Sequence, residues 1–262
     1  RNHINNCTTI FYFIELLRIS LTEAGKLLLE HCERILEDYK RLEYEMHLLH
    51  NEYTGGLKLG ASTTVAQYVL PPLLASFIGK FPHVNLSLLN GNSREIEAAL
   101  QEHRIDLGFV EGVFRLPNIK YTTFLKDELV AVVRTGSKLA IGEEITPEEL
   151  LHLPLVLRER GSGTLDVFER ALQQHNIKLS SLQVLMYLGS TESIKLFLEH
   201  TDCLGIVSIR SITRELYSGQ LRVVEIKDMP MLRDFSFAQP QGQESGLAQV
   251  FMQFAMHYNN KL

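Results

Sequence analysis

The feature that most constrains the fold is a proline-free stretch from residue 21 to about residue 53. Its apolar residues fall on two ladders of seven-residue spacing, offset from each other by four and three residues. One ladder consists of Leu28, Ile35, Leu42 and Leu49, and the other consists of Cys32, Tyr39, Met46 and Tyr53. This is the a/d pattern of a coiled-coil seam. The stretch is therefore predicted to form one long helix whose apolar seam packs against another helix.

The sequence offers two caps for this helix and two ways of covering its seam. Ser20 and Glu23 have the spacing of a capping box, and Thr22 is the alternative cap. An amphipathic helix could pack on its own domain, but matched rungs on both ladders favour a partner helix. The partner we expect is a second copy of the chain, because most soluble oligomers are symmetric homo-oligomers. Residues 21–54 are thus predicted to be a dimerisation helix, with the ladder residues as far as Leu49 in the interface.

After Gly55-Gly56 the pattern changes to an alternation of short strands and helices. Strands are predicted at residues 57–61, 84–89, 105–110, 128–133, 153–157, 182–186, 204–208, 221–226 and 234–238. Helices are predicted at 65–81, 94–102, 165–175 and 192–200, with a further one opened by Thr146-Pro147 and a last one at 245–258. This alternation indicates an α/β fold with parallel strands, here in two tandem lobes.

The charge balance limits the contact that this chain can make with nucleic acid. With 26 Lys and Arg against 31 Asp and Glu the net charge is −5, whereas a nucleic-acid-binding surface needs positive charge. Three widely spaced cysteines without a CxxC pair predict free thiols, no metal site and a reducing cytoplasm. The apolar run before Glu15 is too short to span a bilayer, so no membrane segment is expected. The chain begins with Arg1 rather than Met, and we expect it to be part of a longer protein.

Three predicted helix starts carry short polar residues directly after a strand. They are Ser62-Thr63-Thr64, Gly91-Asn92-Ser93 and Gly161-Ser162-Gly163-Thr164. In an open parallel sheet, strand C-termini and helix N-termini share one edge, where backbone N–H groups and helix dipoles attract anions. Each loop alone is more often an ordinary helix cap. Together they predict a site for a carboxylate, sulfate or phosphate group, beside the positive charge of Arg158 and Arg160.

No motif indicates an enzyme. The GxSxG, HExxH and Walker spacings are absent, and the ten histidines are scattered. Cys203 precedes a predicted strand and is expected to be buried and unreactive. We therefore expect neither catalysis nor a cofactor.

Several segments resemble the LysR-type transcriptional regulators. The run Arg18-Ile19-Ser20-Leu21-Thr22-Glu23-Ala24-Gly25 is similar to the signature at which the wing of a winged helix-turn-helix continues into the linker helix. Further similar segments are Leu57-Lys58-Leu59-Gly60, Leu70-Pro71-Pro72-Leu73-Leu74, Phe81-Pro82, Asp106-Leu107-Gly108-Phe109, Gly189-Ser190-Thr191-Glu192 and Gly205-Ile206. The resemblance extends from about residue 16 to the end of the chain.

This resemblance implies a headpiece remnant at 1–20, a linker helix at 21–54 that pairs two chains, and an effector-binding domain of the type 2 periplasmic-binding-protein fold. Its Rossmann-like lobes would be 55–125 with 229–262, and 126–228, with crossovers near Phe124-Leu125 and 226–234. The implied protein is a homodimeric or homotetrameric cytoplasmic regulator that senses a small anion. Its effector would bind between the lobes at Ser62, Thr63, Thr64, Asn92, Ser93, Arg160, Ser162, Gly163 and Thr164.

The family's DNA-reading helix has no counterpart at the start of this chain. Residues 1–55 hold six Lys and Arg against nine Asp and Glu, a net charge of −3 that is the wrong sign for a DNA-binding surface. We expect promoter DNA to be a partner of the intact protein only, and nanomolar operator binding by this chain in an electrophoretic shift would contradict that. The alternative is a transporter's solute-binding protein, which shares the bilobal fold. The coiled-coil ladders and the lack of an export signal argue against it.

Overall fold

The computed structural model describes residues 12–15, 18–50, 53–112, 115–139, 142–242 and 246–259. Its contacts divide the chain into two compact units, Arg1–Glu52 and Tyr53–Leu262. Of the headpiece remnant predicted at 1–20, residues 1–11, 16 and 17 lie outside the described residues. Within the described part of the chain, no helix combines the length and the apolar composition that a membrane crossing requires.

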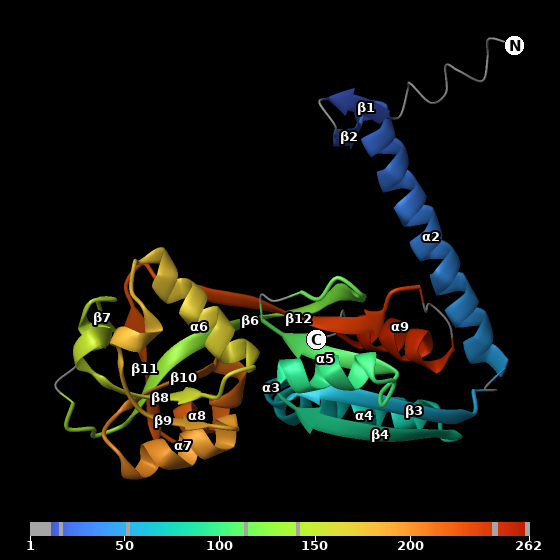
Figure 1. Ribbon diagram of the computed structural model, residues 1–262. Coiled ribbons are helices and arrows are strands. Elements are labelled where there is room, and N and C mark those ends of the chain that lie inside the picture. Colours follow the sequence, from blue (N-terminus) through green and yellow to red (C-terminus); the bar gives the residue numbers. More distant parts are fainter. Residues whose placement is uncertain are drawn as a thin grey trace, which may run out of the picture. The chain divides into compact units, whose positions relative to one another are not determined.

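The first unit contains a β-hairpin followed by one long helix (Figure 1). Strands β1 (Tyr12–Glu15) and β2 (Arg18–Leu21) pair antiparallel, and α2 (Glu23–His50) follows. The backbone N–H of Gly25 donates to Oγ1 of Thr22 over 3.1 Å, so Thr22 caps the helix. The capping box predicted from Ser20 is wrong, because Ser20 is a strand residue paired with Phe13.

The long helix predicted from the two ladders is confirmed. Its ladder residues are exposed in the single chain, namely Leu28, Cys32, Ile35, Tyr39, Leu42 and Met46. The side chain of Leu49 lies outside those that the structure describes. A row of exposed apolar side chains along a helix marks a surface for association.

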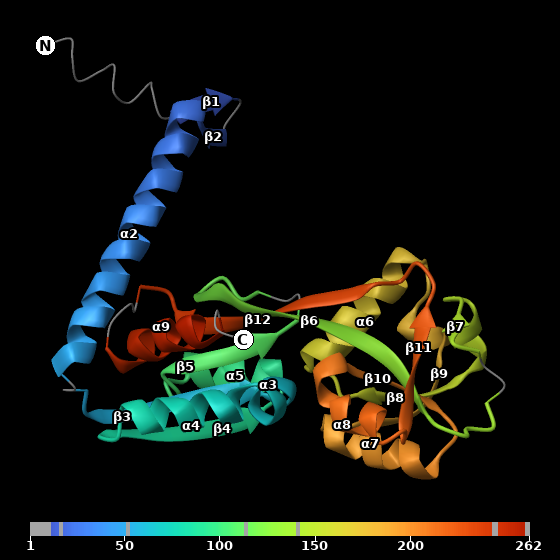
Figure 2. The same cartoon turned by 180° about the vertical axis from the view of Figure 1, so that it is seen from behind.

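The second unit has two α/β lobes joined by the long antiparallel strands β6 (Ile119–Arg134) and β12 (Met231–Pro240) (Figures 1 and 2). In lobe I, β3 (Gly55–Ser62) lies between β4 (Val84–Gly91) and β5 (Leu107–Glu111), and all three are parallel. The helices of lobe I are α3 (Thr63–Tyr68), α4 (Leu70–Lys80), α5 (Ser93–Gln101) and α9 (Leu247–Asn259).

Lobe II repeats this arrangement on the other side of β6. Its strand β8 (Pro154–Arg158) lies between the parallel strands β9 (Gln183–Leu188) and β10 (Leu204–Ser208), and β10 pairs with β6. Strand β11 (Leu221–Ile226) pairs with β6 and with the short β7 (Glu144–Ile145). The helices are α6 (Gly163–Gln174), α7 (Thr191–His200) and α8 (Thr213–Tyr217), with the 3-10 turns η1 (Glu149–His152), η2 (Leu179–Ser181) and η3 (Ile209–Ser211).

Each lobe has its own apolar core, and lobe II has one on each face of its sheet. A cluster around Ile96 packs beneath α5 in lobe I. In lobe II, Leu155 and Leu157 of β8 belong to a cluster with Phe168, whereas Val156 between them belongs to another with Ile194. Successive side chains of a strand point to opposite faces, so β8 contributes to both cores.

Some predicted elements differ from the structure in extent. The helix predicted at 65–81 is divided at Val69, because Pro71 and Pro72 stand in the first turn of a new helix, where the missing N–H of proline is tolerated. The helix predicted to open at Thr146-Pro147 is only the turn η1. Thr146 and Glu149 form two hydrogen bonds with each other at its start, each from a backbone N–H to the other's side-chain oxygen. The strand predicted at 128–133 is the second half of β6, whose first half pairs with β12.

Candidate functional site between the two lobes

The three polar loops meet where the two lobes contact each other. The loops before α3 and α5 belong to lobe I, and the loop before α6 belongs to lobe II. The backbone N–H of Arg94 donates to the carbonyl of Gly161 over 3.3 Å and joins the second loop to the third. A Cβ at Gly163 would lie 2.2 Å from the carbonyl oxygen of Glu111, so glycine at this position allows α6 to approach lobe I closely.

A buried carboxylate occupies the centre of this convergence. Oε1 of Glu111, at the end of β5, accepts hydrogen bonds from Oγ1 of Thr64 over 3.3 Å and from Oγ1 of Thr164 over 3.4 Å. The hydroxyl of Ser93 donates to the backbone carbonyl of Glu111 over 2.8 Å. Oε2 of Glu111 and Oγ of Ser62 are buried and have no hydrogen-bond partner among the described residues. The predicted hydroxyl cradle therefore exists, and the anion in it is the protein's own.

Arg233 of β12 supplies the positive charge for this carboxylate. Its Nη1 lies 3.2 Å from Oε1 of Glu111 and donates to Oγ1 of Thr164 over 3.0 Å. Its Nε donates to Oδ2 of Asp127 on β6 over 2.7 Å, and the hydroxyl of Ser208 donates to Oδ1 of Asp127 over 2.7 Å. Because these side chains are buried, each charge depends on its partners for stabilisation.

A second buried arginine donates hydrogen bonds to residues of both lobes. Arg158, the last residue of β8, donates from Nη2 to Oγ1 of Thr63 in lobe I over 3.3 Å. The same nitrogen donates to the carbonyl of Gly189 over 3.3 Å, and Nη1 donates to Oγ1 of Thr191 over 3.5 Å. Its Nε and Nη2 face the carboxylate of Glu159 at 2.8 and 3.0 Å. The guanidinium is thus held by groups of both lobes.

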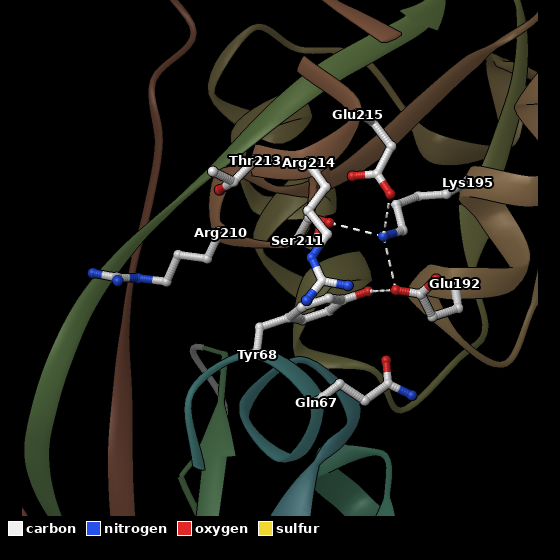
Figure 3. Close-up of a pocket in the computed structure, with 9 residues that line it drawn as sticks. All are labelled: Gln67, Tyr68, Glu192, Lys195, Arg210, Ser211, Thr213, Arg214 and Glu215. Carbon is white, nitrogen blue, oxygen red and sulfur yellow. Dashed lines mark hydrogen bonds and ion pairs between the residues drawn. The ribbon is translucent and has the colours of Figure 1, made fainter. Parts of the chain in front are cut away.

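A cavity of about 620 Å³ lies between the lobes, with α3 on one side and α7, η3 and α8 on the other (Figure 3). Its wall is mostly charged or polar and consists of Gln67, Tyr68, Glu192, Lys195, Arg210, Ser211, Thr213, Arg214 and Glu215. Nζ of Lys195 contacts both acids, at 2.7 Å from Glu192 and 2.8 Å from Glu215. The charge of Arg214 also acts on Glu192 and lowers its pKa.

Tyr68 closes one end of this cavity by reaching across to lobe II. Its hydroxyl donates to Oε1 of Glu192, and its ring lies 5.3 Å from Nζ of Lys195 (Figure 3). Burial and the bond to Glu192 raise the pKa of Tyr68, which keeps the hydroxyl protonated as a donor. Burial alone would raise the pKa of Glu192, but the hydrogen bonds from Lys195 and Tyr68 hold it below its ordinary range. The nearby positive charge of Arg158 acts in the opposite direction and lowers the pKa of Tyr68, but it does not outweigh the other causes.

The predicted site residues divide into three groups. Ser62, Thr63, Thr64, Ser93, Gly163 and Thr164 lie at the lobe contact and are buried. Asn92 and Ser162 are at the contact too, but their side-chain oxygens cap α5 and α6 by accepting from the backbone N–H groups of Glu95 and Leu165. Arg160 is exposed to solvent and away from these contacts. The arginine of this loop that reaches the lobe contact is Arg158.

Several residues of the site were not predicted. Glu111 directly follows a predicted strand, as the chosen loops do, so the same reasoning could have included it. Arg233 carries no local signal, because its partners Thr164 and Asp127 are 69 and 106 residues away in the chain. Tyr68 and Lys195 lie inside helices and meet only through the tertiary structure. The described residues contain no cluster of three or more His, Cys, Asp or Glu side chains that could hold a metal ion.

Comparison with known proteins supports one family throughout. Residues 50–259 match the LysR substrate binding domain. The HTH-type transcriptional regulator YeiE of Escherichia coli K12, itself uncharacterized, is 33% identical over 209 residues, covering 80% of this chain and 69% of the relative. The regulatory domain of Synechocystis PCC6803 CcmR in complex with 2-PG has a TM-score of 0.72 and 27% identity, covering 80% of this chain and 99% of that one. The effector-binding domain of QuiR in complex with shikimate shares the fold, with a TM-score of 0.69 at 20% identity, covering 79% of this chain and 98% of that one.

The family match argues against the alternative of a transporter's solute-binding protein, since the relatives are named as HTH-type regulators. The bilobal sheet with two crossover strands agrees with the solved regulatory domains. The chain therefore belongs to the LysR-type transcriptional regulators, and its bilobal unit is their effector-binding domain.

Proposed function

We propose that this regulator binds a small anionic effector between its two lobes and controls transcription as a cytoplasmic homo-oligomer. The observation that carries the proposal is Arg158, a buried guanidinium in contact with Thr63 of lobe I and Thr191 of lobe II. A ligand that binds there contacts both lobes at once and can stabilise one arrangement of them. Arginine is suited to this role because its planar fork matches a carboxylate or phosphate group.

The surroundings of Arg158 favour an anion over a neutral ligand. The helix starts of α3, α5 and α6 present the positive ends of their dipoles to the lobe contact. The cavity beside them adds Arg214 on its wall. The CcmR regulatory domain was solved with 2-PG and the QuiR domain with shikimate, which is a carboxylate. We extend this ligand class to the present chain.

A thermal-shift screen tests the proposal, because a ligand that binds only the native state raises the melting temperature. The panel contains sulfate, inorganic phosphate, 2-PG and shikimate at constant ionic strength. At least one anion is expected to raise the melting temperature in a saturable way. A panel without any saturable shift would remove the proposal's main support.

Two substitutions locate the site. Thr63→Ala, which removes the hydroxyl that Arg158 contacts in lobe I, and Ser162→Ala are expected to weaken anion binding severalfold while the protein stays folded. Ser162→Ala also loses a helix cap worth about 1 kcal/mol. Its matched control is Thr146→Ala, which removes a hydroxyl that accepts from the backbone N–H of Glu149 away from the lobe contact. Equal loss of binding in Thr146→Ala and Ser162→Ala would show that only stability had changed.

The proposed homodimer or homotetramer forms through the linker helix and the regulatory domain. Besides the ladder on α2, the edge strands of the sheet expose apolar side chains, namely Leu88 and Leu89 on β4 and Leu185, Met186 and Tyr187 on β9. In a twofold-symmetric dimer, β4 of each copy would lie beside β9 of the other copy. The apolar edge strands of both copies would then be covered, and the interface would be closed and symmetric. Promoter DNA is the further partner we propose for the intact protein.

Analytical ultracentrifugation tests the oligomer. The wild-type chain is expected to be at least dimeric, Ile35→Glu is expected to weaken the linker contact, and Leu185→Glu the domain contact. Because each removes one of two interfaces, the double variant is expected to be monomeric. A wild-type chain that sediments as a monomer with and without ligand would contradict the proposal.

A further inference from the structure

Both buried arginines at the lobe contact are already neutralised by carboxylates of the protein. Arg233 faces Glu111 and Asp127, and Arg158 faces Glu159. One edge of a guanidinium holds one bidentate partner at a time, and Glu159 occupies the Nε–Nη2 edge of Arg158. A ligand anion can therefore pair with this edge only when Glu159 leaves it. The resident carboxylate that is easiest to displace therefore determines where the effector binds.

The three carboxylates differ in their access to water. The side chains of Glu111 and Asp127 are 2% and 0% exposed, so neither can leave its arginine without a buried charge losing its partner. The side chain of Glu159 is 27% exposed. When Glu159 turns outward it regains hydration, whereas Glu111 and Asp127 have no such route. Among the described residues of this network, Glu159 is therefore the carboxylate that can leave its arginine and become hydrated.

The backbone around Glu159 is compatible with such a movement. Strand β8 ends at Arg158, and the backbone N–H of Ser162 donates to the carbonyl of Glu159 over 3.2 Å, closing a tight turn in which Gly161 has a φ of +93°. The turn holds the main chain while the side chain of Glu159 can rotate. Adjacent strand residues point to opposite faces, so Arg158 and Glu159 can form a bidentate pair only because the strand stops between them.

We propose that Glu159 is a placeholder whose carboxylate occupies the fork of Arg158 until the carboxylate or phosphate of the effector displaces it. The inference rests on the proposed anion-binding function and assigns a specificity-determining role to Glu159. Nε and Nη2 of Arg158 meet the two oxygens of Glu159 at 2.8 and 3.0 Å, the geometry that a ligand with two coplanar oxygens would reproduce. A neutral ligand gains no such pair and leaves Glu159 in place.

The guanidinium does not depend on Glu159 to hold its position. Thr191 and the carbonyl of Gly189 in lobe II, together with Thr63 in lobe I, accept its remaining hydrogen bonds. Arg158 is thus preorganised for a replacement anion, and exchange of one carboxylate for another preserves the charge balance of the buried site. The new anion also lies beside Thr63, the first residue of α3, so its binding reaches lobe I.

The test compares anion binding by the full chain and by Glu159→Gln, with inorganic phosphate and sulfate as probes in isothermal titration calorimetry. Glutamine keeps the shape of the side chain but lacks its negative charge and one of its two acceptor oxygens, so Glu159→Gln is expected to bind the probes about tenfold more tightly than wild type. Glu159→Asp keeps the charge but shortens the reach, and an intermediate gain is expected. Glu225→Gln, on the exposed edge of lobe II, changes the net charge equally and is expected to match wild type.

The outcomes separate this inference from the proposed function. A gain in Glu159→Gln that disappears when Arg158→Lys is added supports the placeholder. Unchanged, weaker or undetectable binding by Glu159→Gln, with a native circular dichroism spectrum, overturns it, as does an equal gain in Glu225→Gln. If wild type and Glu225→Gln bind no anion while Glu159→Gln does, Glu159 is a fixed partner of Arg158, and both the placeholder and the proposed anionic effector are wrong. Anion binding by wild type that is unchanged in Glu159→Gln overturns the placeholder alone.

Discussion

Buried carboxylates in this protein differ according to the group that faces them. Glu111 is paired with the guanidinium of Arg233, so its charge is compensated. Glu97 on α5 is also buried, but its hydrogen-bond partner is the neutral hydroxyl of Tyr121. Burial raises the pKa of Glu97, and the bond from Tyr121 and the charge of Arg115 only partly offset the effect. The two buried glutamates therefore differ in their partner, which is a cation for Glu111 and a neutral hydroxyl for Glu97.

The pH dependence of Glu97 is testable. As pH rises, Glu97 ionises first in the unfolded chain, because its folded pKa is the higher of the two, and wild type loses stability across that interval. Glu97→Gln keeps a hydrogen-bond acceptor for Tyr121 and cannot ionise. Its urea midpoint is expected to exceed that of wild type at pH 8, and the difference is expected to shrink at pH 4. Exposed Glu102→Gln is the control, and a difference that is constant with pH would contradict the assignment.

Arg233 is the residue whose loss should cost most. Arg233→Ala leaves Glu111 and Asp127 buried without their cation, and breaking such a pair costs about 3 to 5 kcal/mol. The free energy of unfolding measured in urea is expected to fall by about this amount. Arg170→Ala, on the exposed face of α6, is the control and is expected to change it by less than about 0.5 kcal/mol. A small effect of Arg233→Ala would mean that water enters the network readily.

At the scale of elements, helix starts decide how the two lobes meet. Lobe I presents the starts of α3 and α5, and lobe II presents the start of α6. Local chemistry explains the caps, since Asn92, Ser162 and Thr22 each accept a hydrogen bond from the backbone N–H of the third residue of the helix. Close packing of α6 on β5 depends instead on the absence of a side chain at Gly163.

Gly163→Ala tests this packing. Its Cβ would lie 2.2 Å from the carbonyl oxygen and 2.5 Å from the carbonyl carbon of Glu111, and backbone atoms cannot rotate away. The free energy of unfolding is expected to fall by about 1 to 3 kcal/mol, as for other overpacked positions. Gly189→Ala is the matched control, because a Cβ there meets no atom within 4 Å. Equal stability of the two variants would show that α6 can move away from β5 at little cost.

At the scale of the effector-binding domain, the two lobes keep separate apolar cores and meet through polar groups. Strands β6 and β12 carry the chain between them, and Tyr68, Arg158 and Arg94 make hydrogen bonds from one lobe to the other. Polar contacts of this kind contribute about 1 kcal/mol each, less than a shared apolar core would. A ligand bound between the lobes can therefore shift their arrangement without disrupting either core.

Tyr68→Phe tests the contribution of one such contact. The substitution removes the hydroxyl that bonds Glu192 but keeps the ring beside Lys195. Hydrogen exchange of the backbone amides in α3 and at the start of α7 is expected to become severalfold faster in the ligand-free protein, because the closed arrangement loses about 1 kcal/mol. Tyr217→Phe, whose side chain is almost fully exposed, is expected to leave exchange unchanged. Unchanged exchange in Tyr68→Phe would show that the lobe contact does not depend on this bond.

The sequence by itself determined the long ladder-bearing helix, the α/β alternation and the gathering of polar loops at strand ends. These follow from periodicity, capping and the direction of parallel strands, which act between residues close together in the chain. Even here a local rule misled the choice of arginine. Residues 158 and 160 would share a face if β8 continued, but the strand ends at Arg158, and Arg160 is left in solvent.

Only the tertiary structure decided what fills the site. Glu111, Thr164, Asp127 and Arg233 come from separate elements, and their hydrogen bonds join residues 53 to 106 positions apart. Such pairing depends on the order of strands in the sheet and on the side of each strand that a residue occupies. It also depends on burial, which makes a carboxylate seek an arginine wherever the fold supplies one. The sequence therefore predicted the anion cradle, but it did not predict that the protein's own carboxylates occupy it.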